Sequence, residues 1–430
     1  MYRVGFGDFF LMTLTGSDGI ARHILVDCGV HAANLGSIST AIDQLRKDTG
    51  GQLALIIMTH RHADHISGFG VGADVFKTFT VERVWMSYFE NPNDPDAAKF
   101  QAALTAVAEQ LKAPLAQAAA QDADNAQYQQ MAANITGDPS MGGGNAAALK
   151  TLHGGFANTA PVDFYEAGQT PTLPDSLVKA GLTAQILGPP RDKDLIAIVD
   201  NKAHQYLAGN VDDGAAPARL SPRFEGTKAD YPDDAFALFS AAQIEDLIGG
   251  NQPSLHIAMA AKADNTINNQ SLVVLFTFNG KTLLFPGDAQ WGNWDNWLFG
   301  SAQQGNDPQL SATAKEILGK LDFYKVGHHG STNANPKDAV TALRKGVVAM
   351  CSTEPGAYGS VKNNSEVPRG PLMVALKAQT NDQLARADMV QLTAAENTSG
   401  KAVPPTQGVG AVPQIFKTGP NNDLYIDYEM

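Results

Sequence analysis

Leu53-Ala54-Leu55-Ile56-Ile57-Met58-Thr59-His60-Arg61-His62-Ala63-Asp64-His65 is the stretch that decides the fold. Its apolar half has the length of a buried strand, and polar residues at the carboxyl end of a strand lie where open α/β sheets bind their ligands. Three of the ten histidines of the chain lie inside this stretch, within the six residues 60–65. Crowding imidazoles together without a metal costs charge repulsion and desolvation, so the pattern predicts a metal site.

The spacing of this motif suits two ions. His60 and His62 project to the same side if the backbone stays extended, whereas Asp64 and His65 lie beyond a bend and can face a second ion. Imidazole and carboxylate are ligands of zinc, manganese and iron, and two ions about 3.5–4 Å apart form a clamp used in hydrolysis. One segment can therefore serve two metals.

Two later segments repeat the pattern of a short apolar run followed by polar residues. Residues 282–288, Thr-Leu-Leu-Phe-Pro-Gly-Asp, end in Asp288, whose two oxygens could bridge two ions. Residues 323–331, Phe-Tyr-Lys-Val-Gly-His-His-Gly-Ser, contain a pair of histidines after another short strand. Three predicted strand ends thus carry groups of one chemistry.

These motifs resemble those of the metallo-β-lactamase superfamily, whose members carry His-x-His-x-Asp-His, a later bridging Asp and a final His at strand ends. Within it the chain is most similar to the competence-protein (ComEC-like) branch, through Val4–Asp8, Ile24–Gly29, Asn269–Val274, Phe285–Asp288 and Lys325–Ser331. The resemblance covers residues 1–90, 180–195 and 265–380. It implies an α/β fold, with residues 1–430 forming a single αββα metallo-β-lactamase sandwich that carries two insertions.

The resemblance also implies the metal ligands. His60 and His62 would bind the first metal, Asp64 and His65 the second, and Asp288 would bridge the two. The expected cofactors are two divalent ions, zinc first, with manganese and iron as alternatives.

One histidine of the later pair would complete the second metal site. We favour His329 as the ligand and His328 as the group that faces the substrate and protonates its leaving group, and the sequence leaves the reverse open. Asp64 would also orient a hydroxide held between the metals, and Ser331 would contact the substrate anion. The expected function is a dinuclear metal-dependent phosphodiesterase.

Two other functions would use the same residues. The superfamily applies one site to many leaving groups, so hydrolysis of a lactone, thioester or β-lactam is the first alternative. The second is a metal-binding sensor or scaffold without turnover. Bound metal without activity on any ester would distinguish it.

Many members of the superfamily supply a third histidine to the first metal from the region between the opening motif and the bridging Asp. The candidates here are His153, His204 and His256, and each is better explained as an ordinary surface or core histidine. The competence-protein branch often lacks this ligand, so water or substrate could take its place.

Two further residues are predicted to contact the substrate. His31 follows the Asp27-Cys28-Gly29 turn and is expected at the rim of the pocket. Trp291 is the first of three tryptophans at three-residue spacing, for which packing of one helix face is the plainer interpretation. The alternative places Trp291 beside the metals, stacked on a ring or a quaternary ammonium group of the substrate.

Composition limits the partners. The net charge is −13 and no run of Lys or Arg occurs, which argues against duplex DNA, because nonspecific binding to phosphates needs a basic face. A small molecule or short phosphodiester is therefore preferred. No apolar run could span a bilayer and no signal peptide is recognisable, so we expect a cytoplasmic protein without a membrane partner. The two cysteines, Cys28 and Cys351, are expected as buried free thiols, and the oligomeric state is not predicted.

Two segments resemble no known motif. Residues 91–160 combine amphipathic helices with a glycine-rich loop, and residues 192–268 mix loops with a helix near 234–248. Both lie between predicted active-site strands. Loops in that position shape the pocket, so both insertions are expected to form its wall or, alternatively, a dimer contact.

Overall fold

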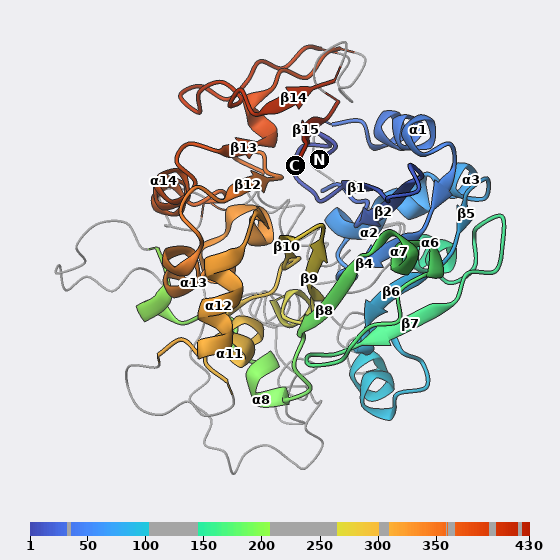
Figure 1. The fold of residues 1–430 in the computed structure, drawn as a ribbon, viewed down its shortest axis with the longest axis horizontal. Coiled ribbons are helices and arrows are strands. Elements are labelled where there is room, and N and C mark those ends of the chain that lie inside the picture. Colours follow the sequence, from blue (N-terminus) through green and yellow to red (C-terminus); the bar gives the residue numbers. More distant parts are fainter. Residues whose placement is uncertain are drawn as a thin grey trace, which may run out of the picture.

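The computed structural model describes residues 1–31, 36–102, 145–206, 265–300, 309–357, 359, 366–394, 401–419 and 424–430. Over these residues the chain has a mixed α/β fold with two main sheets, each containing parallel and antiparallel pairs. Helices lie on the outer sides of the sheets (Figure 1).

Five strands form the first sheet in the described part of the chain, in the order β1-β2-β4-β6-β7. Only the β1–β2 pair is antiparallel among them. The strands are β1 (Phe10–Thr15), β2 (Ala21–Val26), β4 (Leu55–Met58), β6 (Val84–Ser87) and β7 (Val162–Tyr165). A short parallel pair, β3 (Gln52–Leu53) and β5 (Thr80–Val81), lies apart from this sheet.

Six described strands form the second sheet, in the order β13-β12-β11-β10-β9-β8. β10 to β13 are parallel, and β9 is antiparallel to both of its neighbours. The strands are β8 (Thr183–Gly188), β9 (Val273–Phe278), β10 (Lys281–Phe285), β11 (Phe323–Lys325), β12 (Val348–Cys351) and β13 (Leu384–Arg386).

The alternation of side chains along the strands produces three apolar layers. In β4 all four residues are buried, because both faces of this strand are covered. Leu55 and Ile57 join a central cluster that also contains residues of β9 and β10 from the second sheet, so the two sheets face each other across it. Ile56 and Met58 join a second cluster that contains residues of the helices on the outer face. These helices are α1 (Ile38–Thr49), α2 (Ala63–Val71), α3 (Ala73–Phe76) and α6 (Asn145–Leu152).

The second sheet is covered in the same way. In β12, Val348 and Met350 belong to the central cluster, whereas Ala349 and Cys351 belong to a third cluster on the outer face. The helices of this third cluster are α11 (Trp291–Leu298), α12 (Ala312–Lys320), α13 (Lys337–Ala342) and α14 (Gly370–Gln379). Cys351 and Cys28 are both buried free thiols, as predicted.

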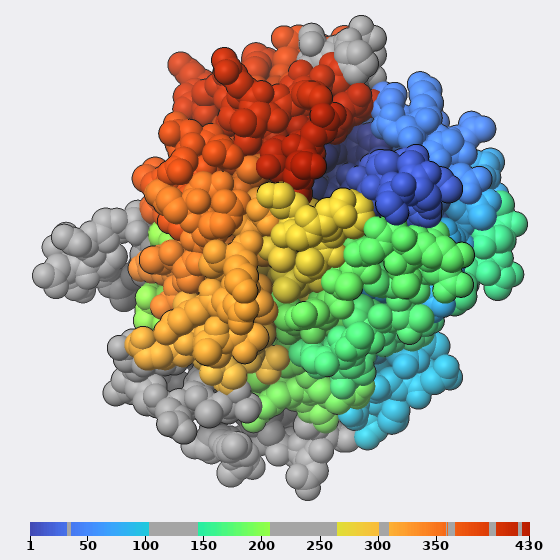
Figure 2. Space-filling model, viewed as in Figure 1, coloured from blue at the N-terminus to red at the C-terminus, as the bar shows by residue number. Residues whose placement is uncertain are grey.

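A small hairpin of β14 (Phe416–Thr418) and β15 (Ile426–Tyr428) ends the chain beside its first residues, where Tyr2 bridges to Tyr425. Figure 2 shows a hollow between these last residues, in red, and the first strands, in blue. A cavity of about 600 Å³ lies here, lined by residues of β1, β10 and β15. None of the predicted metal ligands lines it.

Parts of the two insertions are described. In residues 91–160, a helix covers 95–102 and α6 packs against α2, while 103–144 lie outside the described residues. In residues 192–268, α8 (Lys193–Ile196) packs against α11, and a 3-10 turn covers Lys202–His204. The helix expected near 234–248 also lies outside the described residues. Among the described helices, none has the length and apolar character to cross a membrane.

Candidate metal centre

The opening motif begins where β4 ends and runs into the first turn of α2. In the extended connection His60 and His62 lie on one side, with ring centroids 4.6 Å apart. Arg61 points away from them and makes a two-pronged ion pair with Glu90, at 2.9 and 2.6 Å. This alternation is what an extended backbone dictates, and it gathers the two imidazoles as the sequence predicted.

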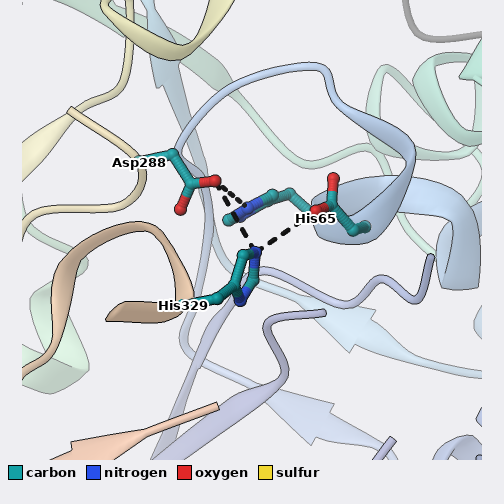
Figure 3. Close-up of side chains that lie close together, drawn as sticks. His65, Asp288 and His329 are labelled. Atoms are coloured by element: carbon teal, nitrogen blue, oxygen red, sulfur yellow. Dashed lines mark hydrogen bonds and ion pairs between the residues drawn. The ribbon is translucent and has the colours of Figure 1, made fainter. Parts of the chain in front are cut away.

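Four buried side chains from three separate segments meet beside this connection. They are Asp64 and His65 in the first turn of α2, Asp288 after β10, and His329 after β11. Their ligand atoms all lie within 4.8 Å of one another, so this quartet could hold a metal ion. The separation is 3.0 Å between His65 Nε2 and Asp288 Oδ2, and 3.2 Å between His329 Nε2 and Asp64 Oδ2. Figure 3 shows Asp288, His65 and His329 pointing toward one another.

Both histidines of the quartet are held by their other ring nitrogen. His65 Nδ1 donates to Asp27 Oδ2 at 2.8 Å, and His329 Nδ1 donates to the carbonyl oxygen of Ser352 at 2.9 Å. Asp27 is itself fixed by Thr59, whose N–H and hydroxyl donate to its two oxygens at 2.8 and 2.7 Å. Such partners orient metal-binding imidazoles and leave Nε2 facing the ion.

His60 presents an unpartnered nitrogen. Its Nε2 is buried and has no hydrogen-bond partner among the described residues, while Nδ1 lies 3.2 Å from the hydroxyl oxygens of both Thr59 and Ser271. Among the described residues, Asp288 Oδ1 accepts no hydrogen bond, and Oδ2 has His65 Nε2 at 3.0 Å without hydrogen-bond geometry, although the backbone N–H of Asp288 donates to Ser271 Oγ at 3.1 Å. Buried polar atoms without partners are rare in proteins, and a bound cation would satisfy these. The residues therefore fit a metal.

Charge in the site shifts the pKa values of its groups. Burial lowers the pKa of His65, but the carboxylates of Asp288, Asp27 and Asp8 outweigh burial and raise it well above its usual value. Burial lowers the pKa of His60 well below the usual range, and the neighbouring charges of His65 and His62 add to the effect. In the metal-free protein, His65 therefore carries positive charge that a metal would otherwise supply, and His60 stays a neutral ligand.

Strained backbone is concentrated at the same place. His328, His329 and Asp27 have φ angles of 44°, 52° and 55°, in the left-handed region that residues with a side chain adopt at a cost. Gly29 comes so close to the motif that a Cβ there would lie 2.3 Å from the backbone of Asp64. Such strain persists only where surrounding structure imposes it, and it is typical of functional sites.

His328 lies at the edge of the quartet. Its Nε2 is 3.5 Å from Asp288 Oδ2, and its side chain is 16 % exposed, whereas that of His329 is fully buried. Burial lowers the pKa of His328 to about 4, against the opposing charge of Asp288. His329 thus lies in the group that could hold a metal, and His328 lies toward solvent, while the assignment of His329 as the ligand stays a prediction. The role of His328 as a proton donor remains a prediction.

The three predicted substrate contacts lie in different surroundings. Ser331 donates its hydroxyl to Asn333 Oδ1 at 2.7 Å within the turn after the histidine pair. His31 is 4 % exposed and packs edge-on against Phe6, so it lies inside the protein and not at an exposed rim. Trp291 is 2 % exposed in the third cluster, which agrees with core packing rather than with a wall of the pocket. Substrate binding by these residues stays a prediction.

The candidates for a third histidine do not join the described metal-binding groups. His153 is exposed at the end of α6. His204 pairs with Asp338 and stacks on Trp291, with ring centroids 4.4 Å apart. His256 lies outside the described residues.

Sequence reasoning missed the groups that support the ligands. In the sequence, Asp8 and Asp27 stand out only as parts of motifs that resemble those of the family, and Lys325 only as the first residue of another such motif. Asp8, Asp27 and His65 form a second buried group with the spacing of metal ligands. The only available signal was that each follows or ends a short apolar run, which does not reveal what an aspartate contacts.

No family model matches the chain, and no curated protein matches it.

Proposed function

We propose that the chain is a metal-dependent hydrolase with the αββα sandwich of the metallo-β-lactamase superfamily, acting on a small or short phosphodiester with two divalent ions. The observation that carries the proposal is the buried quartet of Asp64, His65, Asp288 and His329 at the carboxyl ends of strands from both sheets. Two facing sheets with helices outside, and ligands in this chain order, support the superfamily assignment.

The residues divide the work as follows. The quartet would hold one ion, and His60 with His62 and an oxygen of Asp288 would hold the other. When bound, such ions lower the pKa of water to about 7 and polarise the scissile group. Asp64 would orient the attacking water through its carboxylate. His328, next to Asp288 but partly exposed, is placed to hydrogen-bond a leaving oxygen.

The preference for a phosphodiester of limited size rests on charge. Two divalent ions would leave a site rich in positive charge inside a protein of net charge −13. A small anion can reach such a site, whereas a long duplex would meet the negative protein surface. Carbonyl substrates such as lactones, thioesters or β-lactams would be activated by the same ions, and they form the alternative.

The test combines metal content with turnover of bis-p-nitrophenyl phosphate. We expect wild type to bind two divalent ions and cleave this substrate, and Asp288→Ala to lose both properties. Asp322→Ala is the matched control and should behave as wild type. It removes a carboxylate that pairs with Lys281, at the opposite end of β10 from Asp288. Bound metal with cleavage of lactones or thioesters only would move the assignment to carbonyl substrates. Absence of bound metal under replete conditions would refute the proposal.

A further inference from the structure

The side chain of Lys325, at the end of β11, lies beneath the metal centre and is 2 % exposed. Its ammonium contacts Asp8 Oδ2 directly, donates to the carbonyl oxygen of Gly287 at 3.2 Å, and lies 3.7 Å from Asp288 Oδ1. A buried ammonium in contact with three oxygen-bearing groups has the surroundings of a bound cation.

The same space belongs to the second candidate metal group. Asp8, Asp27 and His65 have ligand atoms within 4.8 Å of one another, and Asp8 Oδ1 is buried without a hydrogen-bond partner among the described residues. Lys325, Asp8 and Asp27 also surround one gap, together with Thr59 and Gly287, that is too small to hold a water molecule while the lysine side chain is present. The ammonium of Lys325 is therefore the cation that neutralises the Asp8–Asp27–His65 group.

Occupation of this group decides which ring nitrogen of His65 carries the proton. An ion bound between Asp8 and Asp27 would take His65 Nδ1 as its ligand, and the ring proton would move to Nε2, which faces Asp288 at 3.0 Å. With Lys325 neutralising Asp8, Nδ1 keeps its proton and donates it to Asp27 at 2.8 Å. Nε2 is then free to bind a metal.

We propose that Lys325 is a built-in cation that occupies the Asp8–Asp27–His65 group, excludes a metal ion from it and thereby keeps His65 Nε2 available to bind a metal in the quartet. Lys325 is thus a positioning residue for the metal centre. The inference rests on the metal site of the proposed function, but its first test uses metal-free protein and involves no turnover.

Lys325→Ala removes the equivalent of a propylammonium ion and leaves the Asp8 carboxylate without its counter-ion. We expect metal-free Lys325→Ala to melt below wild type and to regain stability saturably as propylammonium chloride is added, because the added ion binds the folded state only. Neutral 1-propanol should not restore it. Lys281→Ala, which removes an exposed lysine on the adjacent strand, should show no response to propylammonium.

The metal-loaded proteins give the second readout. Without propylammonium, Lys325→Ala should bind one more divalent ion than wild type and show an altered visible spectrum with Co²⁺, and propylammonium should restore the wild-type spectrum. Asp8→Asn/Lys325→Ala removes both charges, so it should fold and bind no extra ion. The proposal is overturned if Lys325→Ala has the metal content and spectrum of wild type. It is equally overturned if Lys325→Ala fails to fold with every added cation while the double variant folds. If wild type itself binds no divalent ion, the proposed function fails, and the propylammonium experiment still decides the role of Lys325.

Discussion

Asp27→Asn tests whether the hydrogen bond behind His65 controls the metal centre. The substitution keeps the size of the side chain but replaces one carboxylate oxygen with an NH₂ group. If Asn keeps its oxygen toward the backbone N–H of Thr59, its NH₂ group faces His65 Nδ1. The imidazole must then carry its proton on Nε2, the atom that lies 3.0 Å from Asp288. A protonated Nε2 cannot bind a metal.

The alternative orientation of the amide is also unfavourable. It would restore an oxygen for His65 but turn the NH₂ group toward the N–H of Thr59, leaving buried donors unpaired at a cost of about 1–3 kcal/mol. Loss of a partner behind a metal-binding histidine typically lowers metal affinity about 10- to 100-fold. That range corresponds to about 1.4–2.8 kcal/mol, in agreement with the cost of the flipped amide.

The assay is competition for Zn²⁺ against a chromophoric chelator at neutral pH, with wild type and Asp27→Asn measured side by side. We expect the Kd of the tighter site to rise by one to two decades with the number of bound ions unchanged. Asp322→Asn is the matched control, because Asp322 also accepts a backbone N–H, from Thr282 at 3.0 Å, but lies outside the metal centre. A Kd equal to wild type in Asp27→Asn would refute the orienting role.

Three further predictions follow from the same geometry. His329→Ala should lose an ion, whereas His328→Ala should keep its metal and lose turnover by about 10²- to 10³-fold, as expected for the loss of a hydrogen-bond donor to the leaving oxygen. Metal analysis, together with turnover of a phosphodiester that has an alkoxide leaving group, would show a reversed assignment directly. In metal-free protein, burial lowers the pKa of His65, but three carboxylates outweigh burial and raise it. The ion pairs of protonated His65 therefore contribute their full stabilisation at a pH below the pKa of an unfolded histidine, about 6.5. This stabilisation is lost as the pH rises through the pKa of His65 in the folded protein. Urea midpoints across this range should therefore fall more steeply for wild type than for His65→Gln, and parallel curves would contradict the charge argument. Gly29→Ala should destabilise the fold by about 1–3 kcal/mol through its clash with the motif, whereas Gly319→Ala, in the open face of α12, should stabilise it by up to about 1 kcal/mol. Equal urea midpoints for these two variants would show that the clash at residue 29 is relieved by relaxation.

Elements with a strong local signal were predictable from the sequence. The apolar runs before the opening motif and before Asp288 form β4 and β10, and the predicted strand at 347–352 forms β12 at Val348–Cys351. Each run is apolar on both faces, because each strand is covered on both sides, and that pattern is visible without knowledge of the fold. The gathering of His60 and His62 was predictable for the same reason, since it depends only on local backbone geometry.

The contacts between segments were not predictable in this way. Asp27 meets Thr59 because β2 and β4 pair in parallel, with Val26 opposite Ile57. Nothing local to residue 27 encodes that register. Trp291 shows the same limit: its spacing predicts a shared helix face, but its partner is His204, which comes from a distant insertion. Side chains whose role depends on a long-range partner therefore had only their motif as a signal.

The quartet joins the two sheets, and this has a consequence for folding. Asp64 and His65 follow a strand of the first sheet, whereas Asp288 and His329 follow strands of the second. The four ligands can meet only when the two sheets are docked across the central cluster, because neither sheet carries the whole set. A metal ion that binds the quartet therefore favours the docked state over any state in which the sheets separate, and at a free concentration 1,000 times its Kd it would add about 4.1 kcal/mol to the free energy of unfolding. The charge arrangement points the same way, since the buried carboxylates of Asp64 and Asp288 repel each other, and without a metal this repulsion is offset by the imidazoles of His65 and His329, whose pKa values, despite burial, the carboxylates raise.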